Sequence, residues 1–435
     1  MKCTTRWLLG WLALLTAMHG AAQSVLDIEI TGGIEAALPI AIVPFGWQGE
    51  GPSAPQAVAE IIVSDLQRSG QFEPLPIADL VARPEQGKDI RFQDWRLSGV
   101  DNVVVGQVRT MGPDEYAVQF QLFDVVRGKQ LAGYSLPAGR SELRAVAHYI
   151  SDLIFEKLTG VRGAFGTRIA YVVVEGSVEA RRYRLLVAHS DGHSPQTVLE
   201  SQRPIMSPAW SPDGRQLAYV SFEKGPGHIY IQTLESGRRL AVSTHKGING
   251  APAWGPQGRR LALTLSRDGN PEIYLFDITS KRLTRLTHNV GIDTEPAWMP
   301  DGESLLFTSD RAGSPQIYEV AVRGGMPQRI TFEGAYNARP SISADGLNVA
   351  MVHGDGRRSR IAVLNRQTGG LRVLSDGRLD ESPSFAPNGA MILYATRRQG
   401  RGALAGVSID GRVRQSLRVD VGEVREPAWS PFVSR

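Results

Sequence analysis

The sequence has little cysteine: Cys3 is the single cysteine among 435 residues, and it lies in a leader segment that we expect to be removed. The mature chain then contains no thiol, which excludes disulfide bonds, thiol catalysis and cysteine-ligated zinc. A strong charge bias is also missing. The 48 Lys and Arg residues against 44 Asp and Glu residues give a net charge of +4. This excess is too small to indicate a nucleic-acid partner.

Long hydrophobic runs are absent as well. The apolar run from Trp7 to Ala17 is shorter than the roughly 20 residues that a membrane-spanning helix needs. Lys2 and Arg6 precede this run and small residues follow it, a pattern typical of a secretory signal peptide. The sequence predicts a signal peptide over residues 1–22, cut after Ala22, and an exported mature chain without a transmembrane segment.

Motifs of the common catalytic classes do not occur. The patterns G-x-S-x-G, G-x-x-x-x-G-K-[ST] and H-E-x-x-H are all missing, so serine hydrolases, P-loop enzymes and zinc peptidases find no support. His189 and His193 have Asp191 and Gly192 between them, which favours a surface turn over a metal site. We therefore predict a non-enzymatic protein with no catalytic residues, no cofactor and no resident metal.

A motif based on Pro-Ala-Trp returns six times, at intervals of 43 or 44 residues. Its copies begin at Pro208, Pro252, Pro296, Pro340, Pro383 and Pro427. Each of the first five copies is followed by three more apolar runs separated by turns, which gives four short strands per repeat. A period of about 40 to 50 residues with four strands is the signature of a β-propeller blade.

The two ends of the repeat determine the number of blades. Strand-like segments at 168–174, 184–188 and 196–199 lack a first strand, whereas 427–430 is a first strand without followers. Together they complete one blade. Residues 161–435 are therefore predicted to form a six-bladed β-propeller that the C-terminal strand closes. Trp210, Trp254, Trp298 and Trp429 share one repeat position, and we expect them to pack between blades rather than to bind sugar.

Residues 23–160 carry no repeat and are predicted to form a separate small α/β domain. Ser53 and Gln56 match a capping box, which predicts a helix that starts there and ends at Gly70. A second helix is predicted over 141–158. Strands are predicted at 39–45, 101–108, 116–126 and 130–136, in a mixed or antiparallel sheet. The expected fold class is therefore α+β, with this domain followed by the propeller.

The loops that lead into the first strand of each blade open on one face of the propeller, around the mouth of its central channel. Loops on a rigid scaffold are where binding concentrates, and polar or small residues there suit a peptide or protein ligand. The residues concerned are Asn249, Gly250, Ala251, Asp293, Thr294, Glu295, Asn337, Ala338, Arg339, Asp380, Glu381, Arg425 and Glu426.

Two alternatives for these mouth residues stay open. They are solvated turn residues without a partner, or the carboxylates of Glu295, Glu381 and Glu426 hold a hard cation such as Ca²⁺. A metal in the channel would also suit a hydrolase or lactonase, which is the competing class of function.

The whole chain resembles a known family. The strings VPF at 43–45, VVVGQV at 103–108, FEKLTG at 155–160, TRIAYVV at 167–173, MSPAWSPDG at 206–214 and NGAPAW at 249–254 are similar to those of the TolB family. Members of that family are periplasmic components of the Tol-Pal system of Gram-negative bacteria. The signal peptide, the α/β domain and the six repeats agree with this resemblance.

The resemblance implies a periplasmic, monomeric adaptor that supports outer-membrane integrity and constriction during cell division. It implies that the lipoprotein Pal binds the channel mouth, where Asn249, Gly250, Ala251, Asp293, Thr294 and Glu295 match the family's Pal-binding loops. Bacteriocins are a further candidate partner of the same face.

The resemblance also implies that the inner-membrane protein TolA binds the mature N-terminus. This segment comprises Gln23, Ser24, Val25, Leu26, Asp27, Ile28, Glu29 and Ile30. Its alternating apolar residues suit a strand that adds to a partner or docks on its own domain.

Overall fold

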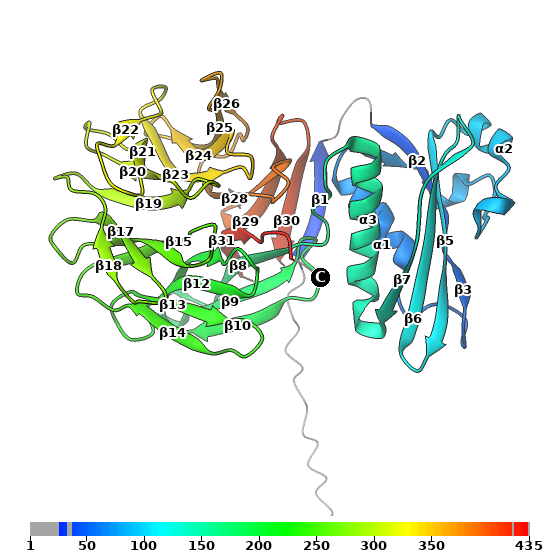
Figure 1. The fold of residues 1–435 in the computed structure, drawn as a ribbon, viewed down its shortest axis with the longest axis horizontal. Helices are drawn as coiled ribbons and strands as arrows, with labels where there is room; N and C mark the ends of the chain where they lie inside the picture. The colour runs from blue at the N-terminus through cyan, green and yellow to red at the C-terminus, as the bar shows by residue number, and fades with distance from the viewer. Residues whose placement is uncertain (1–25, 33–36, 420–421, 434–435) are drawn as a thin grey trace, which may run out of the picture.

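The computed structural model describes residues 26–32, 37–419 and 422–433. Figure 1 shows two bodies side by side, an N-terminal α/β domain and a β-propeller. The predicted fold class is confirmed. The predicted signal peptide over residues 1–22 lies outside the described residues. In the part of the chain that the structure describes, no helix is both long and apolar enough to cross a membrane.

The N-terminal domain is built on a mixed sheet in the order β4-β2-β5-β6-β7, and β3 pairs with β5 beyond the end of β2. The strands are β2 (Leu38–Ile42), β3 (Gly46–Gln48), β4 (Phe72–Pro74), β5 (Asn102–Gly112), β6 (Glu115–Asp124) and β7 (Lys129–Gly139). Strand β2 runs parallel to β4 and β5, and the β5-β6-β7 pairs are antiparallel. The mixed sheet agrees with the prediction.

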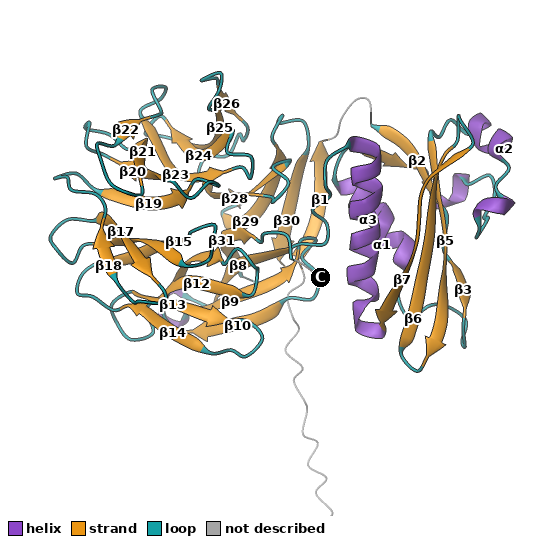
Figure 2. Ribbon diagram, in the orientation of Figure 1, coloured by secondary structure: helices purple, strands orange, loops and turns teal. Residues whose placement is uncertain are grey.

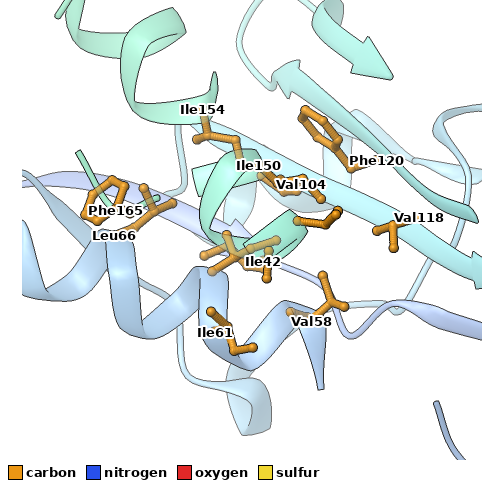
Figure 3. Packing of buried hydrophobic residues seen from close by; sticks show 14 of the residues in the cluster. Ile42, Val58, Ile61, Leu66, Val104, Val118, Phe120, Ile150, Ile154 and Phe165 are labelled. Atoms are coloured by element: carbon orange, nitrogen blue, oxygen red, sulfur yellow. The ribbon is translucent and has the colours of Figure 1, made fainter. Parts of the chain in front are cut away.

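The α-helices lie in the N-terminal domain (Figure 2): α1 (Val58–Arg68), α2 (Phe92–Leu97) and α3 (Leu143–Thr159). Short 3₁₀ helices are η1 (Ile77–Asp79), η2 (Gly87–Asp89), η3 (Arg140–Glu142) and η4 (Val178–Ala180). Helices α1 and α3 lie between the sheet and the propeller. Their apolar faces pack on the sheet, and Figure 3 shows Ile150 and Ile154 beside Val104 and Phe120, with Leu66 beside Phe165.

The predicted start of the first helix is wrong. Helix α1 begins at Val58, and its N-cap Ala57 provides no side-chain hydrogen bond. A helix capped by Ser53 would place Pro55 in its first turn, and a proline disfavours helical geometry for the residue before it. The pair Ser53 and Gln56 therefore does not act as a capping box.

The propeller has six blades arranged around the channel. The first comprises β8 (Arg168–Glu175), β9 (Arg182–His189), β10 (Gln196–Ser201) and β31 (Glu423–Trp429). The second comprises β11 (Ile205–Trp210), β12 (Gln216–Ser221), β13 (His228–Thr233) and β14 (Arg239–Ser243). The third comprises β15 (Asn249–Trp254), β16 (Arg260–Leu265), β17 (Glu272–Asp277) and β18 (Leu283–Arg285).

The fourth blade comprises β19 (Asp293–Trp298), β20 (Ser304–Ser309), β21 (Gln316–Ala321) and β22 (Gln328–Arg329). The fifth comprises β23 (Tyr336–Ile342), β24 (Asn348–Gly354), β25 (Ser359–Asn365) and β26 (Leu371–Val373). The sixth comprises β27 (Glu381–Phe385), β28 (Met391–Arg398), β29 (Arg401–Ser408) and β30 (Arg414–Val419). Strand β1 (Leu26–Gly32) adds to the outer edge of β30.

The C-terminal strand closes the ring, as predicted. Strand β31 pairs with β8 in antiparallel register, with Ala428 opposite Ala170 and Trp429 opposite Ile169. Beyond the strand, the backbone N–H of Ser430 donates to the carbonyl of Arg168 at 2.8 Å. The first blade therefore takes its innermost strand from the far end of the chain.

The repeated tryptophans pack between blades, which confirms their predicted role. Trp210 and Trp298 are buried in separate inter-blade clusters. The indole N–H of each donates to the carbonyl of the motif alanine in the preceding blade: Trp210 to Ala428 at 3.0 Å and Trp298 to Ala253 at 3.1 Å. These bonds tie neighbouring inner strands together.

The N-terminal domain docks on the propeller face opposite the channel mouth. Arg68, at the end of α1, donates to the carbonyl of Ser190 at 3.1 Å and to its hydroxyl at 3.0 Å. Asn388, in a turn between first and second strands, donates to the carbonyl of Arg162 at 3.0 Å. Gln415 of β30 donates to the carbonyl of Arg68 at 2.5 Å. The mouth at the other end of the channel stays open.

A buried charge cluster lies at this interface. His148 of α3 is fully buried, with Nδ1 2.7 Å from Asp65 of α1 and Nε2 3.4 Å from Asp191 of the propeller. Arg144 forms an ion pair with the same Asp191. Burial lowers the pKa of His148, but the neighbouring carboxylates of Asp65 and Asp191 outweigh it and raise the pKa to about 9. His148 is therefore an imidazolium at neutral pH.

Candidate functional site

The residue before each repeat proline adopts a left-handed backbone conformation. The six residues have φ between 43° and 59°, and they are Ser207, Ala251, Glu295, Arg339, Ser382 and Glu426. Each first strand also shifts its register against the second at this point, as in a β-bulge. Non-glycine residues rarely hold positive φ, so a sixfold recurrence indicates a requirement of the site.

These six residues line the central channel and are called the pre-proline ring below. The channel has a volume of about 830 Å³, and its walls are the Pro-Ala-Trp segments of all six blades. Sequence reasoning missed Ser207 and Ser382, whose small uncharged side chains stand out less than those of Glu295, Arg339 and Glu426. Aligning the repeats on their prolines would have identified both residues.

Arg339 organises the charges of the ring. Its guanidinium lies 2.5 Å from Glu426 and 3.7 Å from Glu295, and it donates to the hydroxyl of Ser382 at 2.5 Å. Burial lowers the pKa of Arg339, but Glu426 and Glu295 outweigh it and hold the pKa above its usual range. The two ring carboxylates therefore share one guanidinium that belongs to the chain, which compensates one of their two negative charges.

This arrangement bears on the cation alternative. Glu295 and Glu426 were two of the three carboxylates considered as Ca²⁺ ligands, and the guanidinium of Arg339 lies beside both. Among the described residues, no group of three or more His, Cys, Asp or Glu side chains is placed to hold a metal ion. The pre-proline ring therefore has a guanidinium, that of Arg339, in the place beside the carboxylates where a metal ion would be needed.

Four of the predicted mouth residues are buried and support the loops from within. Asn249, Asp293, Asn337 and Asp380 each stand three residues before a repeat proline. The amide of Asn249 donates to the carbonyl of His245 at 2.7 Å, and Asp293 accepts from Arg311 at 2.7 Å. Asp380 accepts from Thr396 at 2.5 Å, and burial raises its pKa. These side chains fix the loops and are turned away from the surface.

Of the other predicted mouth residues, Ala338 and Glu426 are buried as well, and the rest remain accessible. Gly250, Ala251 and Thr294 are half-buried at the rim, and Glu381 is exposed. Arg425 is half-buried and forms an ion pair with Glu423 at 2.5 Å. Together with the pre-proline ring, these side chains form the surface that a partner can reach.

The N-terminal segment is the second candidate site. Residues 26–30, from Leu26 to Ile30, form most of β1 and pair with β30, with Leu26 opposite Val419 and Ile30 opposite Gln415. Gln23, Ser24 and Val25 lie outside the described residues. The segment therefore docks on the propeller and not on the N-terminal domain to which the sequence assigned it, so its predicted docking on its own domain is wrong.

Comparison with known proteins identifies the family. The model described as the TolB amino-terminal domain matches residues 26–131, and that described as the TolB beta propeller domain matches residues 155–433. A Tol-Pal system protein TolB from Thioalkalivibrio sulfidiphilus is 64% identical over 423 residues, which cover 97% of each chain. The protein of that name from Nitrosococcus oceani is 62% identical over 99% of this chain and 100% of the relative.

A solved structure supports the same assignment. The crystal structure of TolB from Acinetobacter baumannii superposes with a TM-score of 0.87 at 43% identity, and the match covers 94% of this chain and 100% of that one. The fold and the channel mouth define a six-bladed propeller with an appended α/β domain and a polar ring open to a ligand. The chain belongs to the TolB family and is a component of the Tol-Pal system.

Proposed function

We propose that this protein is a non-enzymatic periplasmic adaptor that binds the lipoprotein Pal at its channel mouth and TolA through its N-terminal segment. In this role it supports outer-membrane integrity and constriction during cell division. Membership of the TolB family supports the proposal, and so does the secretory leader that the sequence predicts. The observation that carries it is the pre-proline ring, a rigid polar surface at the open end of the channel.

The geometry favours a protein partner over a small substrate. The backbone of each rim residue is fixed by buried side chains beneath it, such as Asn249 and Asp380, so the surface is preorganised. Preorganisation lowers the cost of ordering the interface on binding. A metal-dependent hydrolase or lactonase would need ligands that converge in the channel, and there Arg339 already pairs with the carboxylates.

Substitution at the mouth is expected to abolish Pal binding. The double variant Ala251→Arg with Thr294→Arg adds two long cations at the rim, and the left-handed position accepts arginine, as Arg339 shows. We expect a loss of affinity of at least about 100-fold, because the bulk and the unpaired charge prevent close contact. Isothermal calorimetry with the soluble domain of Pal measures the effect.

The matched control places the same charges on the opposite face. Gln257→Arg with Thr279→Arg alters exposed turn residues of the same blade, and Pal binding should stay at the level of the unsubstituted protein. Equal binding by the mouth variant would place the Pal site elsewhere. Absence of binding by every form would contradict the adaptor proposal.

The N-terminal segment is expected to respond to Pal. Strand β1 is an edge strand added to β30, and β30 also contacts the N-terminal domain through Gln415. A shift of the propeller on Pal binding would thus change the population of docked β1, and so its availability to TolA. Hydrogen exchange of residues 23–33 with and without Pal tests this coupling. A change in protection is expected, and equal protection in both states would refute the coupling.

A further inference from the structure

The unpaired arginines around the channel mouth are distributed unevenly. Over the second to fourth blades, rim arginines are paired: Arg239 lies 2.7 Å from Glu223, Arg267 lies 3.2 Å from Asp268, and Arg311 lies 2.7 Å from Asp293. Over the fifth and sixth blades, several rim arginines form no ion pair with any described residue. They are Arg357, Arg358, Arg378, Arg398 and Arg401.

The register places these five arginines on the mouth face, next to one another. Residues 355–358 connect β24 to β25, where Gly354 pairs with Tyr336 at the rim. The backbone N–H of Ser359 donates to the carbonyl of Arg378 at 3.0 Å, so Arg378 lies beside that loop. The β28-β29 hairpin ends with Arg398 directly opposite Arg401. We call these residues, with Arg397 and Arg425, the arginine sector.

The pairing of Arg398 with Arg401 is costly to the fold. Like charges directly opposite one another on antiparallel strands are destabilising, and no carboxylate among the described residues pairs with either side chain. Glu423 is already shared by Arg397 at 3.9 Å and Arg425 at 2.5 Å. Asp355 and Asp376 stand in the loops of Arg357 and Arg378, and with Glu381 and Glu423 they are still fewer than the seven arginines of the sector. An excess of positive charge is therefore held at this part of the rim.

A recess lies within the sector. It has a volume of about 260 Å³ and is lined by Arg397 and Arg425 together with Leu379 and Glu381. Leu379 is half exposed there, which adds an apolar contact beside the two guanidinium groups. The recess thus suits a peptide in which an acidic residue stands next to an apolar one.

We propose that the arginine sector binds an acidic segment of the protein partner that occupies the channel mouth. The inference rests on the proposed function and specifies the chemistry of that partner. The sector is continuous with the pre-proline ring through Glu381 and Arg425, so one ligand can span both. The interspersed Glu381 and Glu423 and the concave recess favour a peptide over the flat surface of an anionic membrane.

The test reverses charge in the sector. The variant is Arg357→Glu with Arg398→Glu, in which the second substitution replaces a like-charge pair by an opposite-charge pair and so should not harm folding. Rim charges act mainly on association rate and its salt dependence. We expect association with the soluble domain of Pal to slow about tenfold at about 0.01 M ionic strength, and the difference to shrink at about 0.15 M.

The control variant, Arg215→Glu with Arg259→Glu, makes the same charge change on the opposite face and should associate at the unsubstituted rate. The sector variant could associate with Pal at the unsubstituted rate while Ala251→Arg with Thr294→Arg abolishes binding. That result would refute the role of the arginine sector and leave the adaptor proposal intact. Binding by no form would overturn both. Vesicles of phosphatidylglycerol provide a further test. If the unsubstituted protein sediments with them and the sector variant does not, while both associate with Pal at the same rate, the sector binds a membrane and the proposal is refuted.

Discussion

A chain that ends at Glu426 is expected to lose the cooperative melting of the propeller. Removal of residues 427–435 takes Ala428 and Trp429 out of the first blade. The indole N–H of Trp210 then loses its acceptor, the carbonyl of Ala428, and β8 loses its partners at Ile169 and Ala170. Truncation of a fully buried tryptophan costs about 3 to 5 kcal/mol, which is an upper value for the partly buried Trp429, and the partly open edge adds to this. The sum approaches the total stability of an ordinary domain, about 5 to 15 kcal/mol.

Calorimetric melting of the mature protein and its truncations measures this loss. The control ends at Val433 and should melt like the full chain, because it keeps β31 and the bond between Ser430 and Arg168. The substitution Trp429→Ala should lie between the two, since it leaves the strand in place. Melting of the shorter truncation at the temperature of the full chain would contradict closure by β31.

The folded protein is expected to lose stability as the pH rises from about 6.5 to about 9. His148 has a pKa near 9 in the folded protein and about 6.5 in an unfolded chain. A raised pKa stabilises the folded state fully below the unfolded pKa, and the contribution is lost as the pH passes the folded pKa. One pKa unit corresponds to about 1.4 kcal/mol, so His148 contributes at most about 3 kcal/mol to the free energy of unfolding.

The variant His148→Gln isolates this contribution. At about pH 6 it should melt well below the unsubstituted protein, because it leaves Asp65 and Asp191 without their shared cation. The two melting curves should converge above about pH 9. His193→Gln, in the same loop as Asp191, is the matched control and should follow the unsubstituted profile. A constant difference between the His148 variant and the unsubstituted protein at every pH would show that His148 does not titrate in this range.

The repeat made most of the propeller predictable. Proline, tryptophan and turn glycines recur at fixed intervals, so the blade count, the ring closure and the inter-blade packing follow from periodicity. The left-handed conformation of Glu295 or Arg339 did not follow, because nothing in their side chains favours positive φ. It arises from the bulge that each inner strand needs to turn at the rim.

Contacts between distant parts of the chain were also beyond reach of the sequence. Asp65 and His148 are 83 positions apart, and each has an ordinary place on an amphipathic helix. Their burial depends on the propeller turn at Asp191, which only the docked domains bring near. Likewise the burial of Asn249 and Asp293 depends on loops that fold back over them. In the sequence both residues resemble exposed loop polar residues.

Because of the bulge before each repeat proline, the residues that determine the fold differ from those that contact a partner. Its residue leaves the strand at the channel wall, while the Pro-Ala-Trp segment that follows carries the packing. The pre-proline ring has one residue from each blade, here Ser, Ala, Glu, Arg, Ser and Glu. A single substitution can change one residue of the ring without altering the packing of its blade. Such a scaffold can acquire or discard partners in small steps while its architecture is preserved.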